Sequence, residues 1–300
     1  MTATVSGTDG GFDIELSLAT DGLLPGRSVD GRLRIVARDG GSIRGARVTL
    51  VGTETWRYDV TTTDSKGRVQ TTTHTGNEEL PKVPVAVLGP TDFAAGEVRE
   101  LDLQLPVPSL GPPTVEGTEF KIEWEIRANL DVPGFDPEVV LPVRIHQPTS
   151  LLRAGVVDVA QFALYDAADA QAGDLAGSIW LEPVPLCVGA PFRGELMLTS
   201  GEARDVQEVR LELWAIVKST VSGGRSDGIT LWTGRLAGEG RFGGEVATYA
   251  FEGVLPGQSL PTTRTEHGRV DAQFHVIVAR SWAPDPHLVR DVAICTTTEL

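Results

Sequence analysis

Side chains that commonly bind metals or act in catalysis are few in this sequence and lie far apart. The five histidines do not pair at the spacing of metal ligands; they are His74, His146, His267, His275 and His287. His275 falls on the outward face of an alternating segment, residues 270–278, which predicts a solvated surface histidine. Asp285 shares the segment "WAPDPHL" with His287, but the prolines there favour a turn over half a metal site. The sequence therefore predicts no metal centre.

Other arrangements of catalytic residues are missing or stand in the wrong context. The chain has no H-E-x-x-H, no C-x-x-C and no G-x-x-x-x-G-K-[ST] motif. Glu123 and Glu125 share the solvent face of one predicted strand, where an open sheet offers no cleft for acid–base catalysis. The glycine-rich segments 39–45 and 238–245 lead into predicted strands, so they indicate hairpin turns rather than phosphate sites at a helix N-terminus. We therefore expect no enzymatic activity and no cofactor.

The most distinctive polar stretch is residues 57–79, "RYDVTTTDSKGRVQTTTHTGNEE", which is rich in threonine and poor in large apolar residues. Its simplest interpretation is a long β-hairpin in solvent, with "DSKG" at residues 64–67 as its tip. Long loops carry function more often than short ones, so the tip is also our candidate partner-binding loop. The seven residues of that loop are Asp64, Ser65, Lys66, Gly67, Arg68, Val69 and Gln70. Residues 219–232 form a second polar loop of similar character.

The overall composition limits the classes of partner and compartment. The chain has 300 residues and a formal net charge of −15, without clustered lysine or arginine, which argues against nucleic acid or an anionic membrane as a partner. No run approaches the ~20 apolar residues that span a bilayer, and the first residues lack the features of a secretory signal. We therefore expect a cytoplasmic protein. The abundance of alanine, glycine, aspartate and arginine favours a bacterial source.

Cys187 and Cys295 are the only two cysteines. Two cysteines do not make a disulfide framework, and a reducing compartment disfavours a single bridge between them. Their expected role is that of small buried apolar residues.

Alternating apolar and polar residues dominate the chain and predict β-strands. In "FKIEWEIRANL", residues 120–130, the apolar side chains fall on one face and the polar ones on the other. The same period of two recurs in residues 12–18, 32–36, 209–213 and 270–278. A strand with one face on a core and one in water is typical of an antiparallel sheet. The sequence therefore predicts an all-β fold of antiparallel sandwiches.

A repeat relates the two halves of the chain. Residues 24–35 align without gaps on residues 187–198, at an offset of 163 positions, and two glycines match two glycines: Gly26 on Gly189 and Gly31 on Gly194. A repeat of this length indicates two related domains rather than a solenoid of short units.

The predicted domains are two immunoglobulin-like sandwiches in tandem, at residues 10–147 and 176–297. Residues 148–175 between them are predicted to be a linker. The segment 156–171, "VVDVAQFALYDAADAQ", is the one stretch of this linker whose pattern suggests a short helix.

The order of several motifs in the first half resembles the N-terminal domain of arrestins. "LLPGRSVDGRLRI" stands in the place of the family's tyrosine-proline-glycine turn and following strand, although Leu24 replaces the usual tyrosine. "IRGARVTLVGTETWRY" resembles the family's I-[KR]-G strand. "LQLPVPSLGPPTVEGTEFKIEWEIRANLD" resembles its block of P-P-S-[FY]-E-G followed by an alternating strand. The second half is similar to the arrestin C-terminal domain more loosely.

The resemblance implies an arrestin-like fold, closest to the α-arrestin, bacterial arrestin-like and sporulation-control branch. It implies a non-enzymatic adaptor or scaffold that binds protein partners through polar loops, sheet edges or an inter-domain groove, in regulation or signalling. The family's phosphate-sensing charged core matches no residue pattern here, and neither a P-P-x-Y motif nor a clathrin box occurs.

Three other functions remain open from the sequence. One is an enzyme with an unusual site, which a bound metal or ligand would reveal, although nothing in the sequence predicts one. Free sheet edges allow a self-assembling structural homo-oligomer. A surface module that binds carbohydrate or protein is a further alternative, although the lack of a signal segment and of a disulfide framework argues against it.

Overall fold

The computed structural model describes residues 3–134, 136–152, 160–167, 173–281 and 285–298. Strands make up nearly all of their regular structure, and the only helix in these ranges is α1 (Thr149–Leu152). Almost all strand pairs are antiparallel. The predicted all-β antiparallel fold is therefore confirmed. No helix in the described ranges has the length and apolar character needed to cross a membrane.

Contacts between residues group the chain into two compact units. Unit 1 consists of Met1–Arg57, His74–Glu116 and Phe120–His146, and unit 2 consists of Tyr58–Thr73, Gly117–Glu119 and Gln147–Leu300. The segment 58–73 therefore belongs to unit 2, although the strand that carries its first residues begins in unit 1.

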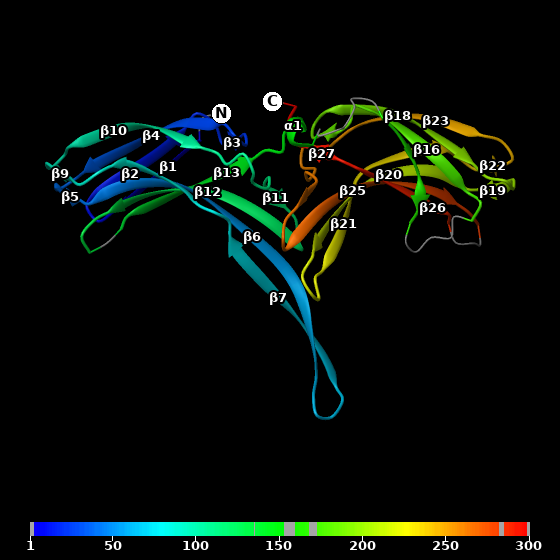
Figure 1. Ribbon diagram of the computed structural model, residues 1–300, viewed down its shortest axis with the longest axis horizontal. Helices are drawn as coiled ribbons and strands as arrows, with labels where there is room; N and C mark the ends of the chain where they lie inside the picture. Colours follow the sequence, from blue (N-terminus) through cyan, green and yellow to red (C-terminus); the bar gives the residue numbers. More distant parts are fainter. Residues whose placement is uncertain (1–2, 135, 153–159, 168–172, 282–284, 299–300) are drawn as a thin grey trace. The chain divides into compact units, whose positions relative to one another are not determined.

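Unit 1 contains two main sheets and a small one (Figure 1). The first sheet has the order β1-β2-β4-β10, with β1 (Ala3–Asp9), β2 (Phe12–Leu18), β4 (Ser28–Ala37) and β10 (Val98–Pro106). The second has the order β3-β13-β12-β6-β7, with β3 (Gly22–Leu23), β13 (Glu138–Ile145), β12 (Phe120–Asp131), β6 (Gly45–Thr63) and β7 (Val69–Glu79). Two further strands join the second sheet, β11 (Val115–Glu116) on β12 and β8 (Val83–Leu88) on β6. The small sheet pairs β5 (Gly41–Ile43) with β9 (Thr91–Phe93).

The core of unit 1 follows from the alternation in its strands. In β12 each second side chain is buried, and the members of this buried row are Phe120, Ile122, Trp124, Ile126, Ala128 and Leu130. The Trp124 indole satisfies its one polar group by donating from Nε1 to the Pro112 carbonyl at 3.1 Å. Burial of a large apolar side chain contributes about 1.5–3 kcal/mol, so this row holds the sheet onto the core.

Unit 2 has the same kinds of sheet. One has the order β14-β16-β18-β23, with β14 (Ala160–Ala163), β16 (Ala176–Glu182), β18 (Pro191–Thr199) and β23 (Ala247–Val254). The other has the order β15-β26-β25-β20-β21, with β15 (Tyr165–Asp166), β26 (His287–Val292), β25 (Gly268–Ala279), β20 (Glu208–Ser219) and β21 (Ser226–Ala237), and β24 (Thr263–Arg264) pairs with β25. Two short pairs complete it, β17 (Leu186–Cys187) with β27 (Ile294–Cys295) and β19 (Arg204–Val206) with β22 (Gly240–Phe242).

Aromatic rings from the two main sheets of unit 2 meet in its core. Phe274 of β25 lies 6.1 Å from Phe192 of β18 and 6.0 Å from Phe251 of β23, measured between ring centroids. Trp232 of β21 packs edge-on against Phe192 at 5.3 Å. Edge-to-face pairs at these separations stabilise the packing of one sheet on the other, so the unit is a sandwich.

The two units share one topology. The order β1-β2-β4-β10 corresponds to β14-β16-β18-β23, and β13-β12-β6-β7 corresponds to β26-β25-β20-β21. The repeat found in the sequence falls on equivalent turns, where Gly26 and Gly189 both adopt a φ of 74°. Glycine takes this left-handed conformation without the steric cost that a side chain would meet.

The predicted helix between the domains is wrong over the residues that the structure describes. Residues 160–163 and 165–166 form β14 and β15, which pair with β16 and β26. Alternation in "AQFALYD" is better satisfied by edge pairing than by a helix, because Phe162 can then cover the guanidinium of Arg290 at 4.6 Å. Residues 156–159 and 168–171 of the predicted helix lie outside the described residues.

Candidate functional site

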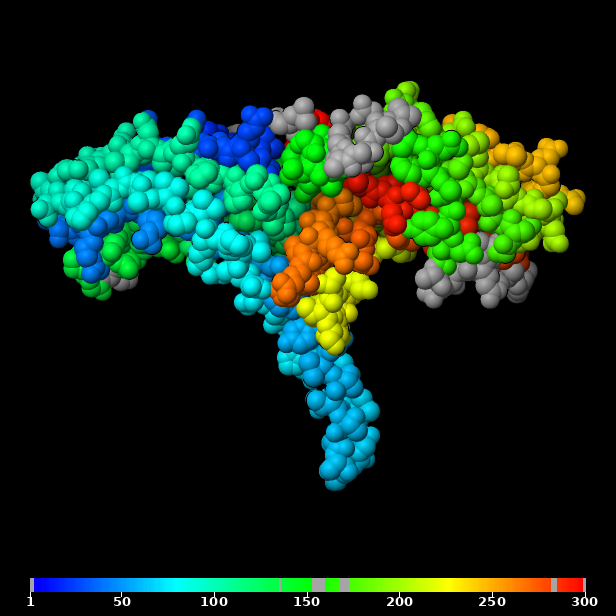
Figure 2. Space-filling view, in the orientation of Figure 1, coloured from blue at the N-terminus to red at the C-terminus, as the bar shows by residue number. Residues whose placement is uncertain are grey.

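The 57–79 stretch forms a two-stranded ribbon, in which β6 and β7 continue together to a turn at residues 64–68 (Figure 1). All residues from 60 to 75 are exposed, on both faces of the ribbon. The space-filling view shows these side chains open on the face turned to the reader (Figure 2). Residues 60–75, which we call the ribbon arm, therefore present a large surface that no core requires.

The tip of the ribbon arm is folded by one carboxylate. Oδ1 of Asp64 accepts hydrogen bonds from the backbone N–H of Lys66 at 2.8 Å and of Arg68 at 2.9 Å. The Asp64 carbonyl accepts the N–H of Gly67 at 3.0 Å, and Gly67 has a φ of 75°. Aspartate commonly closes turns in this way, and glycine suits the left-handed position. The turn is therefore an ordered structure rather than a loose loop.

Among the seven residues of the predicted partner-binding loop, the structure separates two groups. Asp64 and Gly67 shape the turn. Lys66, Arg68 and Val69 are exposed, and Val69 keeps 67% of its surface accessible. The remaining two, Ser65 and Gln70, are also exposed. With one acidic and two basic residues, the ribbon arm carries a formal charge of +1 on a chain of charge −15.

Hydrogen bonds between side chains stabilise the strands behind the tip. The hydroxyl oxygens of Thr61 and Thr71 lie 3.1 Å apart across the ribbon, and Thr73 donates to Oδ1 of Asp59 at 2.7 Å. Cross-strand threonine pairs of this kind contribute roughly 0.2–1 kcal/mol each. The threonine-rich composition of the stretch thus stabilises a ribbon that has no core of its own.

The base of the ribbon arm is tied to the loop between β20 and β21, and all residues of this contact belong to unit 2. Arg225 pairs with Asp59 at 3.1 Å and with the buried Glu119 at 2.9 Å. The hydrogen bonds with Asp59 and Glu119 raise the pKa of Arg225. The backbone N–H of Asp59 also donates to the Gly223 carbonyl at 2.8 Å. The polar loop at residues 219–232 therefore holds the base of the ribbon arm in place.

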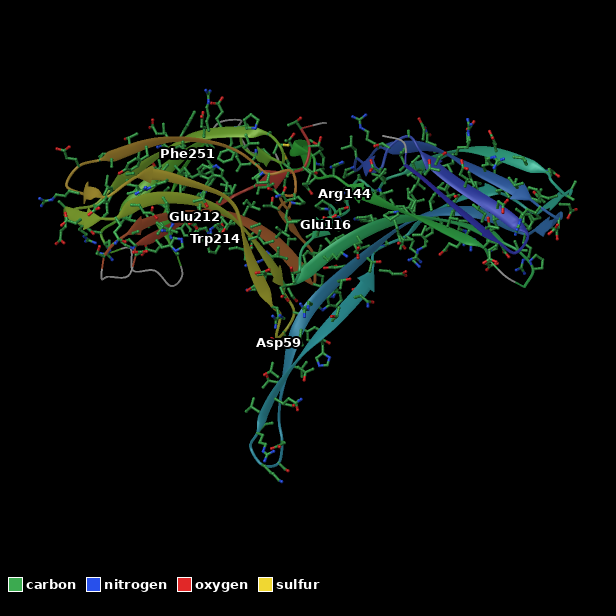
Figure 3. All side chains as sticks on the ribbon, turned by 180° about the vertical axis from the view of Figure 1, so that it is seen from behind. Asp59, Glu116, Arg144, Glu212, Trp214 and Phe251 are labelled. Atoms are coloured by element: carbon green, nitrogen blue, oxygen red, sulfur yellow. The ribbon has the colours of Figure 1, made fainter. Side chains whose placement is uncertain are left out.

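A second cluster lies on the outer face of the β20-β25-β26 sheet in unit 2. Nδ1 of His275 and Nε2 of His287 are 2.6 Å apart, and the Trp214 ring stacks on His275 at 4.7 Å. Glu212 stands opposite His275 in the strand register and accepts the indole N–H of Trp214 at 2.8 Å. Figure 3 labels Glu212 and Trp214 on β20.

The expectation of a solvated His275 is wrong, because only 7% of its surface is exposed. Its outward direction was inferred correctly, but Trp214 and His287 cover it. Burial, and then the proximity of His287, lower the pKa of His275 to about 4, while burial lowers the pKa of His287. Burial therefore favours the neutral form of both rings.

The spacing of the two histidines in the sequence does not indicate that they form a pair. Twelve positions separate the two residues, and they meet only because β25 and β26 pair in a register that sets Ile277 opposite His287. His275 and His287 then become diagonal neighbours on one sheet face, a relation that long side chains can bridge. The register itself could not be derived from the histidines.

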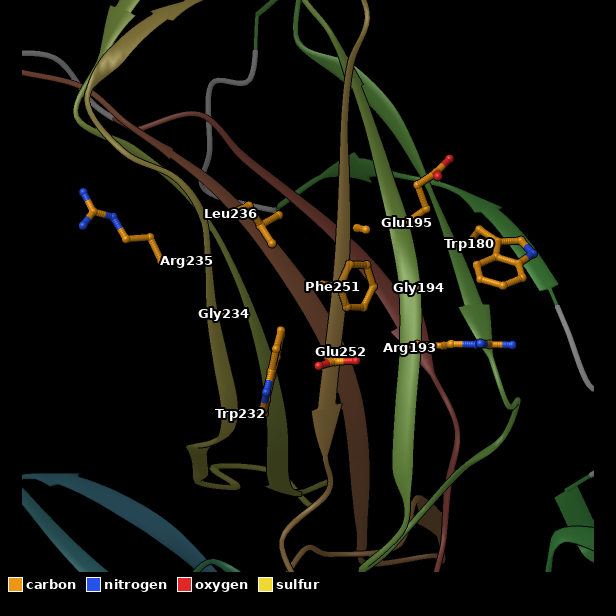
Figure 4. Close-up of a pocket in the computed structure, with 11 residues that line it drawn as sticks. Trp180, Arg193, Gly194, Glu195, Trp232, Gly234, Arg235, Leu236, Phe251 and Glu252 are labelled. Atoms are coloured by element: carbon orange, nitrogen blue, oxygen red, sulfur yellow. The ribbon is translucent and has the colours of Figure 1, made fainter.

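A third feature is an open groove of about 660 Å³ in unit 2 (Figure 4). Aromatic and charged side chains line it, and the main ones are Trp180, Arg193, Glu195, Trp232, Phe251 and Glu252. Arg193 is held on Glu182 at 2.7 Å. Such a mixture can bind a ligand or peptide, but the groove brings together neither a nucleophile with a base nor a histidine among its lining residues.

The structure also places a serine motif and the two cysteines of the sequence. Residues 224–228 read Gly-Arg-Ser-Asp-Gly, so the chain does contain a G-x-S-x-G motif. A nucleophile elbow needs its serine at a strand-to-helix turn, whereas Ser226 begins β21 in a β-hairpin. Cys187 and Cys295 are buried, as expected, and face each other in the short parallel pair of β17 and β27. Burial, followed by hydrogen bonding with Cys187, raises the pKa of the Cys295 thiol.

Comparison with known proteins adds no assignment, since no protein-family model matches the chain and no curated protein matches its sequence. The ribbon arm, the histidine pair and the groove are thus defined by their geometry alone.

Proposed function

We propose that this protein is a non-enzymatic adaptor that binds a protein partner through the ribbon arm. The observation that carries this proposal is the exposure of every residue from 60 to 75 on an ordered ribbon. A strand pair that contributes nothing to a core loses conformational entropy without gaining apolar burial. A contact with a partner would supply that burial.

The chemistry of the tip suggests what the partner offers. Lys66 and Arg68 follow each other around a turn that Asp64 holds in place, so both cations are presented from a preorganised support. Exposed Val69 adds a small apolar contact. Preorganisation lowers the entropic cost of binding. We expect an acidic protein surface or segment as the partner, because charge complementarity speeds encounter and selects orientation.

The resemblance of the motif order to arrestins is compatible with this proposal. It supports an adaptor role in regulation or signalling. On this basis the proposed adaptor is an arrestin-like scaffold in the cytoplasm of a bacterium. The exposed ribbon supports the binding role by itself, whichever family the chain belongs to.

The test is a pair of baits in native lysate. One bait is the full chain, and the other has residues 61–71 replaced by Asn-Gly, a two-residue hairpin turn. This replacement keeps Asp59 and Thr73, which accept hydrogen bonds from Arg225 at the base. Circular dichroism and light scattering then show whether the fold and the oligomeric state are preserved.

A partner that mass spectrometry finds only with the full chain, and whose purified form binds it directly, would support the proposal. Lys66→Glu combined with Arg68→Glu should then weaken that binding, whereas Arg241→Glu on the exposed β22 should not. A partner that binds both baits equally would place the binding site elsewhere. If neither bait captures a partner and both associate with themselves, the self-assembly alternative replaces the adaptor.

A further inference from the structure

The outer face of the β20-β25-β26 sheet brings two ring nitrogens into direct opposition. Nδ1 of His275 and Nε2 of His287 are 2.6 Å apart, with the ring planes inclined at 45°. Two imidazole lone pairs that face each other repel unless a proton or a cation lies between them. In the neutral pair one ring donates its N–H to the other, and a metal ion that replaced this proton would be bound by both rings.

We propose that His275 and His287 bind a divalent late transition-metal ion, of the class of Zn²⁺ or Ni²⁺, between these two nitrogens. Histidine nitrogens bind such ions at about 2.0–2.1 Å, so the two nitrogens of one ion are roughly 2.9–3.4 Å apart. The pair has to open by less than about 1 Å to reach this separation. His287 is only partly buried and is the first residue of β26, so its ring has room to move.

Two nearby carboxylates favour a cation, against the opposing effect of burial, and one aromatic ring holds one ligand in place. The carboxylates of Glu212 and Asp291 act electrostatically on His275, and both favour positive charge there. Arg210 opposes this effect at His287, but its guanidinium is itself paired with Glu212 at 2.8 Å. The stacked Trp214 ring fixes the plane of His275.

A second, independent observation concerns the far side of the His275 ring. Its Nε2 atom is buried and has no hydrogen-bond partner among the described residues. No neighbour on this side of the ring fixes the tautomer, and the ring can carry its proton on Nε2 while Nδ1 offers a lone pair to an ion. Metal-bound histidines in high-affinity sites normally donate this proton to an acceptor, so its absence limits the strength of binding.

The expected site has two protein ligands, with water in the remaining positions. Among the described residues no group of three or more histidine, cysteine, aspartate or glutamate side chains is arranged to hold a metal. A two-histidine site without such a third ligand should bind in the micromolar range and follow the usual preference for Ni²⁺ and Cu²⁺ over Mn²⁺.

The experiment is calorimetric titration of the full chain, first stripped with a chelator, with NiCl₂ and with ZnCl₂ alone at pH 7.5. We expect one ion per chain, and at least a tenfold weaker affinity for His287→Gln. His275→Phe keeps a ring against Trp214 and should also abolish binding, while His74→Gln, on the exposed ribbon arm, serves as the control. Circular dichroism verifies that each variant is folded.

Two results would overturn the proposal. One is the absence of binding by the wild-type chain. The other is equal affinity in folded His287→Gln, which would place the ion on other residues. Electron paramagnetic resonance of the Cu²⁺ complex gives an independent readout, because two coordinated imidazoles produce a nitrogen splitting pattern that one imidazole does not.

Discussion

Arg225 and Asp59 form an ion pair with 3.1 Å between Nη1 and Oδ2, although 166 positions separate them in the chain. The same guanidinium binds Glu119, whose side chain is 7% exposed, through Nε at 2.9 Å. One cation thus joins Asp59, the residue just before the ribbon arm, to a buried carboxylate of the same unit.

Loss of Arg225 should destabilise unit 2. Arg225→Ala removes the guanidinium partner of the buried Glu119, and loss of one member of a buried ion pair is destabilising. We expect a lower midpoint of urea unfolding. The control is Arg144→Ala, because Arg144 pairs with Glu116 in the open, where such pairs contribute little (Figure 3). Equal midpoints for the two variants would contradict the importance assigned to Arg225.

Gly194 should not tolerate a side chain. A Cβ atom at this position would collide with the Trp180 carbonyl and the Phe251 ring. Overpacking of this kind costs about 1–3 kcal/mol, so Gly194→Ala should lower the free energy of unfolding by that amount. Gly240→Ala is the matched control, since a Cβ atom at Gly240 meets nothing within 4 Å. Calorimetric melting of both variants tests the difference, and an unchanged melting temperature for Gly194→Ala would refute it.

The folded turn at the tip of the ribbon arm should depend on the side chain of Asp64. Asp64→Ala removes the two hydrogen bonds to the N–H groups of Lys66 and Arg68. Their amide hydrogens should then exchange faster, while the global free energy of unfolding changes by less than about 0.5 kcal/mol, because the tip is exposed. Ser65→Ala is the control, since the hydrogen bonds of the turn do not use its side chain. Unaltered exchange in Asp64→Ala would mean that the backbone alone forms the turn.

Tyr165 should lose its proton at a higher pH than an ordinary tyrosine. Burial, and then its hydrogen bond to Oδ2 of Asp291 at 2.7 Å, raise the pKa of Tyr165 to about 12. A raised pKa in the folded state stabilises the protein fully below the unfolded value of about 10, and this contribution is lost as the pH rises toward 12. It is small, because 40% of the residue is exposed. The difference in ultraviolet absorbance between wild type and Tyr165→Phe measures the midpoint, and a value near 10 would exclude the effect.

Local patterns were sufficient to predict the fold class and the equivalent turns. The alternation around Trp124 is a property of neighbouring residues, so it predicts which face is buried without knowledge of the partner strands. Gly26 and Gly189 match in the repeat because both turns need the same left-handed backbone. The polar tip at residues 64–67 was likewise predictable from its turn-forming residues.

Features that depend on strand register were not predictable. His275 and His287 meet only through the pairing of β25 with β26, and the burial of His275 depends on Trp214 from β20. Arg225 contacts Asp59 and Glu119, although both residues are remote from it in the sequence. The helix predicted over residues 160–166 is wrong, because edge pairing rather than the local period decides the structure of this segment.

The shared topology of the two units provides an internal comparison for the ribbon. In unit 2 the equivalent hairpin is formed by β20 and β21 with 12 residues each, whereas β6 has 19 and β7 has 11. The same strand order is therefore realised once with a long extension and once without it. The shorter copy acts as a natural deletion variant, because the same strand order forms there without the extension.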